Sequence, residues 1–334
     1  MATKRVFSGI QPTGSIHLGN YLGAIRNWAA IQDRYDCIYC VVDYHAITAL
    51  YDPKTLREKS LDLAADLIAC GINPDKSILF VQSHVQEHTE LCWVFNSVTA
   101  YGDLTRMTQF KDKSQHAAEI GDGFINAGLF NYPILQAADI ALYEAHYVPV
   151  GKDQQQHVEL SREIVRKFNS VYGNLLVEPD VLLTEGADIR SLADPNCKMS
   201  KSYGEKHIIG LMEPEGAIEK KFKRAVTDSG LEEATTQMSP GVANLFTILR
   251  LTRPDSADRL EAAYHDKSLM YSELKGEVYD AVMETLVPIR ARKEELANDP
   301  GQLAEILSDG ARKAHKIAER TMDKVRAHVG VGKT

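Results

Sequence analysis

Two short stretches of this 334-residue chain combine the residue types and the spacing needed to hold phosphate groups. The first, from Ser8 to Asn20, contains glycines at positions 9, 14 and 19 together with His17. It follows a strand-like run at 5–7 and precedes an amphipathic run, which predicts a strand, a glycine turn and a helix start. Such a turn points backbone N–H groups and the positive end of a helix dipole at a ligand. Neither the P-loop nor the Rossmann G-x-G-x-x-G spacing is present, so a different phosphate site is indicated.

The second stretch is Lys198-Met199-Ser200-Lys201-Ser202, in a polar segment far along the chain. Its two lysines are flexible point charges that can follow moving phosphate oxygens, which arginines would hold more rigidly. By itself, such a lysine pair is usually a solvated basic loop. The presence of His17-Leu18-Gly19-Asn20 at a turn near the N-terminus favours phosphate binding instead.

The elements that must position these stretches alternate along the first part of the chain. Apolar runs predict strands at 5–7, 37–43, 78–81 and 147–150, and helical spacing predicts helices at 21–32, 52–71, 132–143 and 155–169. This alternation is typical of a parallel α/β sheet, which binds ligands at the carboxyl ends of its strands. Beyond residue 189 the pattern predicts helices at 217–227, 242–251, 257–264, 273–292 and 302–329.

The composition is that of a folded protein large enough for two domains, with 44% hydrophobic residues, 25% charged residues and a net charge of −8. There is no run of 18 apolar residues and no signal-peptide core, so a cytosolic protein without membrane spans is expected. The five cysteines fit a reducing compartment. Cys37-x-x-Cys40 could form half of a zinc site, but no second ligand pair exists, so buried thiols are expected.

The turn and the lysine pair resemble the two signatures of class I aminoacyl-tRNA synthetases. His17-Leu18-Gly19-Asn20 stands in place of the HIGH sequence, and KMSKS is intact at 198–202. Five further stretches are similar, in the same order, to bacterial tryptophanyl-tRNA synthetases: residues 7–14, 43–48, 107–111, 132–133 with 137–139, and 148–154. The resemblance implies an α/β fold, namely the Rossmann-like doubly wound parallel sheet of class I synthetases plus a smaller all-helical domain.

The same resemblance implies a division of the chain into four parts. Residues 1–190 would form the Rossmann-like catalytic domain with the ATP and tryptophan sites, and residues 191–206 the KMSKS loop and junction. Residues 207–300 would form a helical anticodon-binding domain. The C-terminal helix, 301–334, is expected to pack back on the catalytic domain.

The implied reaction sends an ionised carboxylate at the α-phosphorus of ATP, so it needs alignment and charge stabilisation rather than a general base. By resemblance, the residues that act on the phosphates are His17, Asn20, Lys111, Lys198 and Lys201. The implied ATP-binding residues are Gln11, Pro12, Thr13, Gly19, Asn20, Gly151, Lys152, Asp153, Ile189, Lys198, Met199, Ser200, Lys201 and Ser202.

Mg²⁺ is expected to arrive with the nucleotide, because this ion usually binds through substrate phosphates. No cluster of residues has the spacing of a protein-built metal site. His84 and His88, four residues apart, could suggest one, but they are interpreted as exposed imidazoles at a helix start.

Selectivity for tryptophan requires an acceptor for the indole N–H, because a tyrosine-sized competitor would leave that acceptor unpaired. Asp139 matches the family's indole-binding aspartate, and its apolar neighbours indicate a buried carboxylate that needs a partner. The other implied pocket residues are Phe7, Gly9, Gln11, His45, Tyr132, Val150 and Gln154. Gln136 stands where several relatives have Met and Lys152 where several have Glu, which affects the shape of the pocket and the charge near the ribose.

The implied macromolecular partners are tRNA(Trp) and a second copy of the chain. Most of the negative charge lies in residues 1–190, whereas residues 191–334 are nearly neutral. Basic clusters at 220–224, 290–293 and 312–316 suggest a tRNA surface on helices, although each alone is commonly a solvated helix face. The apolar run around Val94, Phe95 and Val98 predicts either a homodimer interface helix or a buried core helix.

Three alternatives compete with tryptophan–tRNA ligation. A tyrosyl-tRNA synthetase shares the fold and differs in the amino acid that drives exchange between ATP and diphosphate. A non-catalytic tRNA-binding relative is expected to lack some of the phosphate-binding residues, and those named above are all present. A small-metabolite nucleotidyltransferase also uses a His-x-Gly-His turn, but it would leave the long helical half without a purpose.

Overall fold

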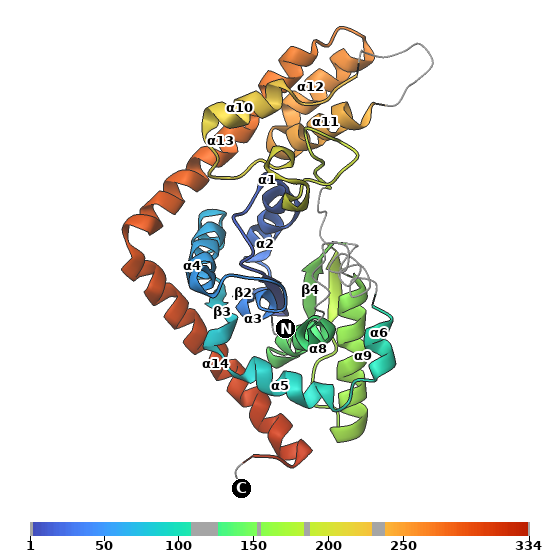
Figure 1. Ribbon diagram of the computed structural model, residues 1–334, viewed down its shortest axis with the longest axis vertical. Helices are drawn as coiled ribbons and strands as arrows, with labels where there is room; N and C mark the ends of the chain where they lie inside the picture. Colours follow the sequence, from blue (N-terminus) through green and yellow to red (C-terminus); the bar gives the residue numbers. More distant parts are fainter. Residues whose placement is uncertain (1–2, 108–125, 152–154, 184–187, 229–237, 333–334) are drawn as a thin grey trace.

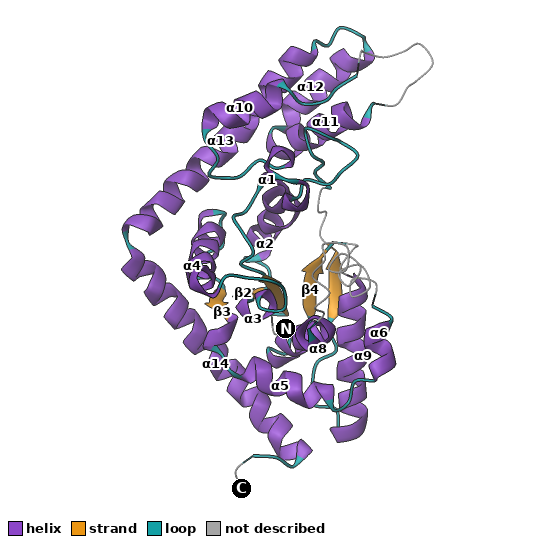
Figure 2. Ribbon diagram, viewed as in Figure 1, coloured by secondary structure: helices purple, strands orange, loops and turns teal. Residues whose placement is uncertain are grey.

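The computed structural model describes residues 3–107, 126–151, 155–183, 188–228 and 238–332. At its centre is a parallel five-stranded sheet (Figure 2) with the strand order β3-β2-β1-β4-β5. The strands are β1 (Arg5–Ile10), β2 (Asp36–Val41), β3 (Ile78–Val81), β4 (Tyr147–Val150) and β5 (Asp180–Leu183). After β3 the chain crosses to the far side of β1, so the carboxyl ends of β1 and β4 flank the switch point where such sheets bind ligands.

The predicted parallel α/β class is confirmed, with two differences at the strands. β1 continues through Ser8 and Gly9 to Ile10, residues that the sequence assigned to the turn, because they pair with Tyr39 to Val41 of β2. β5 has no counterpart in the prediction, since this short edge strand is partly exposed and has a weak apolar signal.

Alternate side chains of the strands enter two apolar cores, one on each face of the sheet. The first core receives Val6, Cys37, Tyr39, Val41, Leu79 and Val81. The second receives Phe7, Ile38, Cys40 and Phe80, and also Val42 directly after β2. Cys37 and Cys40 are therefore buried thiols, as predicted.

Helices pack on both faces of the sheet. On the first face lie α1 (Leu18–Asn20), a π-helical turn (Tyr21–Ile25), α2 (Arg26–Ile31) and α4 (Pro53–Ala69). On the second face lie α5 (Glu87–Asn96), α8 (Ala127–Leu142) and α9 (Gln155–Tyr172). Short helical turns follow β2, β3 and α5, namely α3 (Asp43–Ala46), η2 (Gln82–His84) and α6 (Tyr101–Thr105). Within the described ranges, no helix combines the length and apolar character needed to cross a bilayer.

The structure corrects the predicted start of one of these helices and decides between the two alternatives left open for another. α8 begins at Ala127, ahead of the predicted start at residue 132, because the Asn126 side chain accepts the N–H of Leu129 at 2.8 Å and Pro133 is tolerated inside the helix. α5 is a core helix, because Val94 is 9% exposed and Phe95 is fully buried against Phe168.

The helical region consists of α10 (Glu215–Lys223), α11 (Pro240–Thr252), α12 (Pro254–His265), α13 (Tyr271–Asn298) and α14 (Pro300–Val329). These are the five helices predicted beyond residue 189, and proline at the first position begins three of them. Side chains of α11, α12 and α13 belong to the same apolar core as the first face of the sheet.

The last two helices form a bent strap along one side of the molecule (Figure 1). α13 descends from the helical region, and α14 continues along the sheet to the C-terminus. Gly310 of α14 packs so closely on the carbonyl of Leu79 in β3 that a Cβ atom there would collide with it. Arg326 forms two hydrogen bonds with the Glu90 carboxylate of α5, at 2.8 and 2.6 Å. These contacts hold α14 against β3 and α5.

Three of the basic residues proposed as a tRNA surface instead hold the fold together, so that interpretation is wrong for them. Lys221 donates to the carbonyls of Glu205 and Ile208. Arg290 donates to two carbonyls of the 211–213 segment at 2.7 Å. Lys293 lies 2.7 Å from both Asp62 and Asp66, which attaches α13 to α4.

Candidate active site

The glycine turn begins where β1 ends, at the centre of the sheet. His17 caps the helix that follows, because its Nδ1 accepts the N–H of Asn20 at 3.3 Å and Asn20 Oδ1 accepts the N–H of His17 at 3.2 Å. This reciprocal capping box holds the imidazole in place. Since Nδ1 is an acceptor, the neutral ring carries its proton on Nε2, where it can donate to an anion.

A second segment, residues 209–211, is hydrogen-bonded to the glycine turn. The N–H of Leu18 donates to the carbonyl of Ile209 at 2.8 Å, and the N–H of Leu211 donates to the carbonyl of Ile16 at 3.2 Å. His17 and Gly210 form an antiparallel bridge between these bonds. Because this segment follows the KMSKS sequence directly, the chain returns from the lysine pair to the glycine turn.

The lysine pair lies on a hairpin that is hydrogen-bonded to the helical region and packs against the glycine turn of the α/β region. Met199 donates its N–H to Ile189 at 2.9 Å, and both side chains are buried. Asn244 of α11 is 4% exposed and bonds both main-chain groups of Arg190. Its Oδ1 accepts the N–H at 2.8 Å, and its Nδ2 donates to the carbonyl at 2.9 Å. The helical region therefore positions the base of the hairpin.

Glycines allow the hairpin to approach the turn closely. A Cβ atom on Gly14 would meet the ammonium group of Lys201, and the φ of +151° at Gly14 is rarely adopted by other residues. A Cβ atom on Gly19 would lie 3.2 Å from the Cβ of Met199. The fold thus brings together the two stretches that the sequence suggested for phosphate binding, although they lie far apart along the chain.

The lysines change the charge state of the histidine beside them. Burial, and the positive charges of Lys201 and Lys198, lower the pKa of His17 to about 4. Partial burial also lowers the pKa of Lys201, although Asp66 and Glu205 oppose this shift. At neutral pH the ring is therefore uncharged, and the lysines carry the positive charge that a polyphosphate would meet.

A buried carboxylate lies at the same edge of the sheet. Asp139 of α8 is 1% exposed, and its Oδ1 accepts from Gln82 Nε2 at 2.7 Å and from His88 Nδ1 at 2.6 Å. Its Oδ2 accepts from His45 Nε2 at 2.8 Å. Burial raises the pKa of this carboxyl, but the two histidines more than offset the effect, and the net shift is downward. The group is therefore an ionised acceptor.

Aromatic rings surround this carboxylate. Phe7 stacks on Tyr143 with the ring centres 5.4 Å apart, and the rings of Tyr132 and His45 form a T-shaped pair with their centres 6.4 Å apart. Gly9, two residues beyond Phe7 and on the same face, is exposed although it belongs to the central strand. An exposed main chain beside aromatic rings and one carboxylate suits an aromatic ligand with a single N–H donor.

The structure places most of the residues predicted for the site at these two positions. Phe7, His45 and Tyr132 belong to the group of side chains around the Asp139 carboxylate, whereas His17, Gly19, Asn20, Met199 and Lys201 meet at the turn. Gln11, Pro12 and Thr13 follow β1, and Val150 and Gly151 lie at the end of β4. Lys198 is exposed beside Met199, and the hydroxyls of Ser200 and Ser202 lie 2.9 Å apart. Lys111, Lys152, Asp153 and Gln154 lie outside the described residues.

The sequence interpretation of His88 is wrong. His84 is exposed as predicted, but His88 is fully buried, and with Gln82 it binds Asp139. Helical spacing contained a signal for this, because His88 lies three residues before Leu91 and seven before Phe95, on the apolar face of α5.

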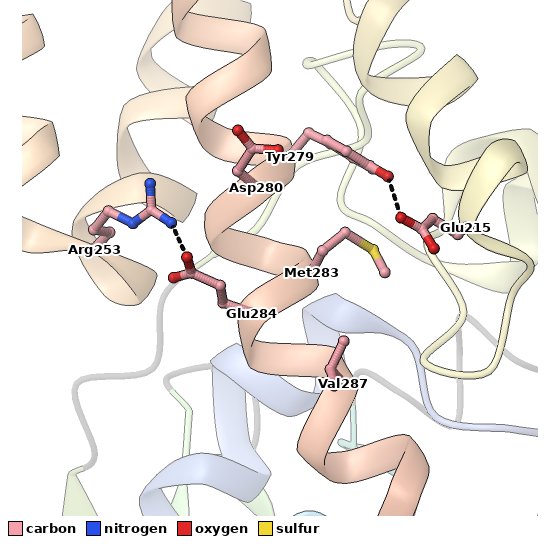
Figure 3. A pocket seen from close by; sticks show the side chains of 7 residues that line it. All are labelled: Glu215, Arg253, Tyr279, Asp280, Met283, Glu284 and Val287. Carbon is pink, nitrogen blue, oxygen red and sulfur yellow. Dashed lines mark hydrogen bonds and ion pairs between the residues drawn. The ribbon is translucent and has the colours of Figure 1, made fainter.

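A surface depression of about 650 Å³ lies in the helical region, away from these residues (Figure 3). Its charged side chains include Glu215, Asp280 and Glu284 but only one cation, Arg253, which binds Glu284 at 2.6 Å. Tyr279 donates to Glu215 at 3.0 Å. This acidic surface is unsuited to a triphosphate.

The doubly wound sheet and the joined HIGH-type and KMSKS stretches define a class I aminoacyl-tRNA synthetase. Residues 2–287 match the model of a family described as tRNA synthetases class I (W and Y). A tryptophan–tRNA ligase from Wolinella succinogenes is 48% identical over 336 aligned residues, which cover 99% of this chain and all of that protein. The chain belongs to this family, and within it to the tryptophan–tRNA ligases.

Solved structures agree with this assignment. The tryptophanyl-tRNA synthetase of Campylobacter jejuni, in complex with ADP and tryptophan, has a TM-score of 0.83 and 35% identity, and the match covers 98% of this chain and all of that one. The enzyme from Mycoplasma pneumoniae has a TM-score of 0.87 and 32% identity, and the match covers 99% of this chain and 98% of that one.

Proposed function

We propose that this ligase binds its two small substrates along one edge of the sheet, with ATP at the glycine turn and L-tryptophan beside Asp139. It forms tryptophanyl-adenylate and diphosphate, and then transfers tryptophan to tRNA(Trp). The observation that carries this proposal is the contact of Lys201 with Gly14, at the end of the same strand whose Phe7 borders the Asp139 site. Strand β1 and the turn that follows it therefore border both of the proposed substrate sites.

In the first step a tryptophan carboxylate oxygen attacks the α-phosphorus of ATP. The new bond joins that oxygen to phosphorus, and the bond between the α-phosphorus and the bridging oxygen breaks as diphosphate leaves. Lys198, Lys201 and Lys111 stabilise the charge on the phosphates, and His17 donates from Nε2. Mg²⁺ enters with ATP as part of the substrate, because the ion binds chiefly through phosphate oxygens.

The nucleotide is held by main-chain groups as well as charges. Gln11, Pro12, Thr13, Gly19 and Asn20 provide the turn and the helix start, while Gly151, Lys152 and Asp153 follow β4 on the ribose and adenine side. Ile189 supports the adenine side through its position in the hairpin, since its own side chain is 1% exposed. Met199, Ser200 and Ser202 hold the loop that carries the lysines.

Tryptophan is selected by its indole N–H. The Asp139 carboxylate accepts that hydrogen bond, with Phe7, Gly9, Gln11, His45, Tyr132, Val150 and Gln154 around the side chain. Tyrosine lacks a donor at the same place, so it would leave a buried anionic acceptor without its partner, and such a loss is expected to cost about 10⁴- to 10⁵-fold in specificity.

Exchange of label between diphosphate and ATP tests the proposal directly. Exchange should require tryptophan and should not occur with tyrosine. Exchange driven by tyrosine alone would show that the Asp139 site is wrongly assigned. A chain that binds tRNA but exchanges with no amino acid would instead be a non-catalytic tRNA-binding protein.

For tRNA(Trp), the exposed basic residues in and directly after α10 are the first candidates. Lys220 of α10 and Arg224, directly after the end of this helix, are exposed, in contrast to Lys221 of α10. We expect the double substitution Lys220→Ala, Arg224→Ala to weaken tRNA charging and to reduce its salt dependence, while exchange without tRNA is unchanged. Lys54→Ala, at an exposed lysine in the first turn of α4, is the control.

A homodimer is supported by exposed aromatic side chains in α5 and at the start of α6. Trp93 is 78% exposed and Tyr101 is 73% exposed, with the Tyr101 ring 5.3 Å from that of Phe130. The contact between Tyr101 and Phe130 makes an aromatic pair at the surface, and exposed apolar patches are typical of association surfaces. Light scattering should find a dimer for the wild type and a monomer for Trp93→Lys, and a wild-type monomer would contradict this part of the proposal.

The cytoplasm is the proposed location. Protein synthesis uses the product there, and all five cysteines are unpaired in the structure, as expected in a reducing compartment.

A further inference from the structure

We infer that His88, supported by Tyr143, is a positioning residue for tryptophan: it occupies Oδ1 of Asp139 and so directs the indole N–H to Oδ2. This inference rests on the proposed role of Asp139 in the tryptophan site. His88 would act through the carboxylate and not on the substrate, and it belongs to a helix that contributes none of the other proposed site residues.

The hydrogen bonds of Asp139 leave little freedom to the incoming N–H group. A carboxylate offers about four acceptor positions, two on each oxygen. Gln82 and His88 fill both positions on Oδ1, and His45 fills one on Oδ2. The remaining position is on Oδ2, and an indole N–H that binds this group must use it.

The direction of each hydrogen bond around Asp139 follows from the neighbouring groups. Tyr44 donates its N–H to Gln82 Oε1 at 3.1 Å, so the NH₂ group of Gln82 faces Asp139. Burial raises the pKa of Tyr143 well above its ordinary value, so this hydroxyl keeps its proton and donates to His88 Nε2 at 2.7 Å. His88 Nδ1 must then carry the proton that it donates to Asp139.

Tyr143 therefore donates a hydrogen bond to His88, and His88 in turn donates one to the carboxylate. His88 is fully buried, and its ring lies 5.4 Å from that of Tyr143 and 5.8 Å from that of Phe80. The ring therefore has one orientation available, and its donor cannot turn away from Asp139. A buried donor fixed in this way has more effect on its acceptor than an exposed histidine would.

The surroundings also explain why losing His88 should change the acidity of Asp139. The titratable groups that face the carboxylate are His45, His88, Cys40, Cys92 and Tyr143. Of these, the two histidines favour the ionised carboxylate, whereas burial opposes it. Replacing His88 by an apolar residue removes a donor and raises the pKa of the Asp139 carboxyl.

The experiment compares His88→Leu, His88→Asn and Tyr143→Phe with His84→Ala, a control on the exposed histidine nearby. Tryptophan-dependent exchange supplies kcat and KM, and 1-methyltryptophan, which has no indole N–H, is measured as a competitor. We expect His88→Leu to raise KM for tryptophan about 10- to 100-fold, with a smaller change in kcat. The inhibition constant of 1-methyltryptophan should change about twofold or less, because this analogue cannot use Asp139.

The variants and the pH profile separate positioning from mere support of the fold. His88→Asn keeps an N–H donor near the Nδ1 position and should recover part of the affinity, and Tyr143→Phe should have an intermediate effect. KM for tryptophan should begin to rise at a higher pH in His88→Leu than in the wild type as the pH is lowered, because the variant carboxyl of Asp139 has the higher pKa and is protonated first.

Three outcomes overturn the inference. One is an unchanged KM in His88→Leu, another is an equal loss for tryptophan and 1-methyltryptophan, and the third is a loss of thermal stability without a new pH dependence. Asp139→Ala distinguishes these from a failure of the proposed site. Unchanged tryptophan binding in that variant would show that Asp139 does not bind the indole at all.

Discussion

The two ends of the proposed active site differ in how their side chains are held. At the indole end, Asp139 is 1% exposed and three side chains donate to it. At the phosphate end, Lys198 and Lys201 are exposed on a hairpin. The indole end is thus a buried, fixed hydrogen-bond network, and the phosphate end is a pair of long, adjustable cations.

The difference follows from what each end must do. The indole ring keeps its shape through the reaction, so a rigid acceptor loses nothing as the transition state forms. The phosphates change, because negative charge moves onto diphosphate as the bond breaks, and flexible ammonium groups can follow it. Substitutions at the phosphate end should therefore affect rate, and those at the indole end should affect affinity and stability.

Lys201→Ala is expected to have the largest effect. The change removes a cation that stabilises the leaving diphosphate, so kcat for tryptophan-dependent exchange should fall about 10²- to 10³-fold. KM for tryptophan and the midpoint of urea unfolding should hardly change. Lys206→Ala, an exposed lysine just beyond the signature, is the matched control. A Lys201→Ala enzyme with normal kcat and weak tryptophan binding would contradict the division between the two ends.

Asp139→Ala should produce the opposite pattern. Without the carboxylate, His45, His88 and Gln82 lose their acceptor, which should lower the free energy of unfolding by about 1–3 kcal/mol. KM for tryptophan should rise about 100-fold, with a smaller change in kcat. Urea unfolding and exchange kinetics provide the two measurements. An unaltered unfolding midpoint would show that the network adds no rigidity.

Asn244→Ala tests how far the helical region controls the phosphate end. The side chain bonds both main-chain groups of Arg190, so its loss should loosen the hairpin and lower kcat about tenfold without changing KM for tryptophan. Thr247→Ala on the same helix, which removes only a bond to its own turn, is the control. Equal effects of both substitutions would mean that Asn244 matters only for helix packing.

The titration of His17 should show the smallest effect, and it tests the interaction between His17 and Lys201 directly. Its pKa of about 4 lies below the ordinary value of 6.5, so the unfolded chain binds a proton first as pH falls. The neutral ring therefore contributes stability above about pH 6.5 that is lost as pH falls toward 4. NMR of the imidazole should show a midpoint near 4, and Lys201→Ala should raise it. The same midpoint in the wild type and in Lys201→Ala would show that the two groups do not interact.

Many of the strands and helices, and the residues proposed for the phosphate end, could be predicted from local patterns in the sequence. Strand β3 at 78–81 and β4 at 147–150 lie where apolar runs placed them, and the five C-terminal helices follow helical spacing. The glycines and lysines of the phosphate end are sequence signals in themselves, because their roles depend on backbone freedom and charge. By contrast, Lys221, Arg290 and Lys293 show that a basic cluster does not reveal whether it meets solvent or another helix.

The amino-acid sequence alone determined the class of the protein and indicated the residues proposed for its phosphate end, since contiguous motifs and hydrophobic periodicity are local properties of the chain. Only the tertiary structure decided how Asp139, at the proposed indole end, is held by Gln82 and His88. Gln82, His88 and Asp139 come from three separate elements, and a histidine on a helix can face water or the core. Their contact arises because parallel strands end at one edge and α5 and α8 pack over it, which no short stretch of sequence encodes.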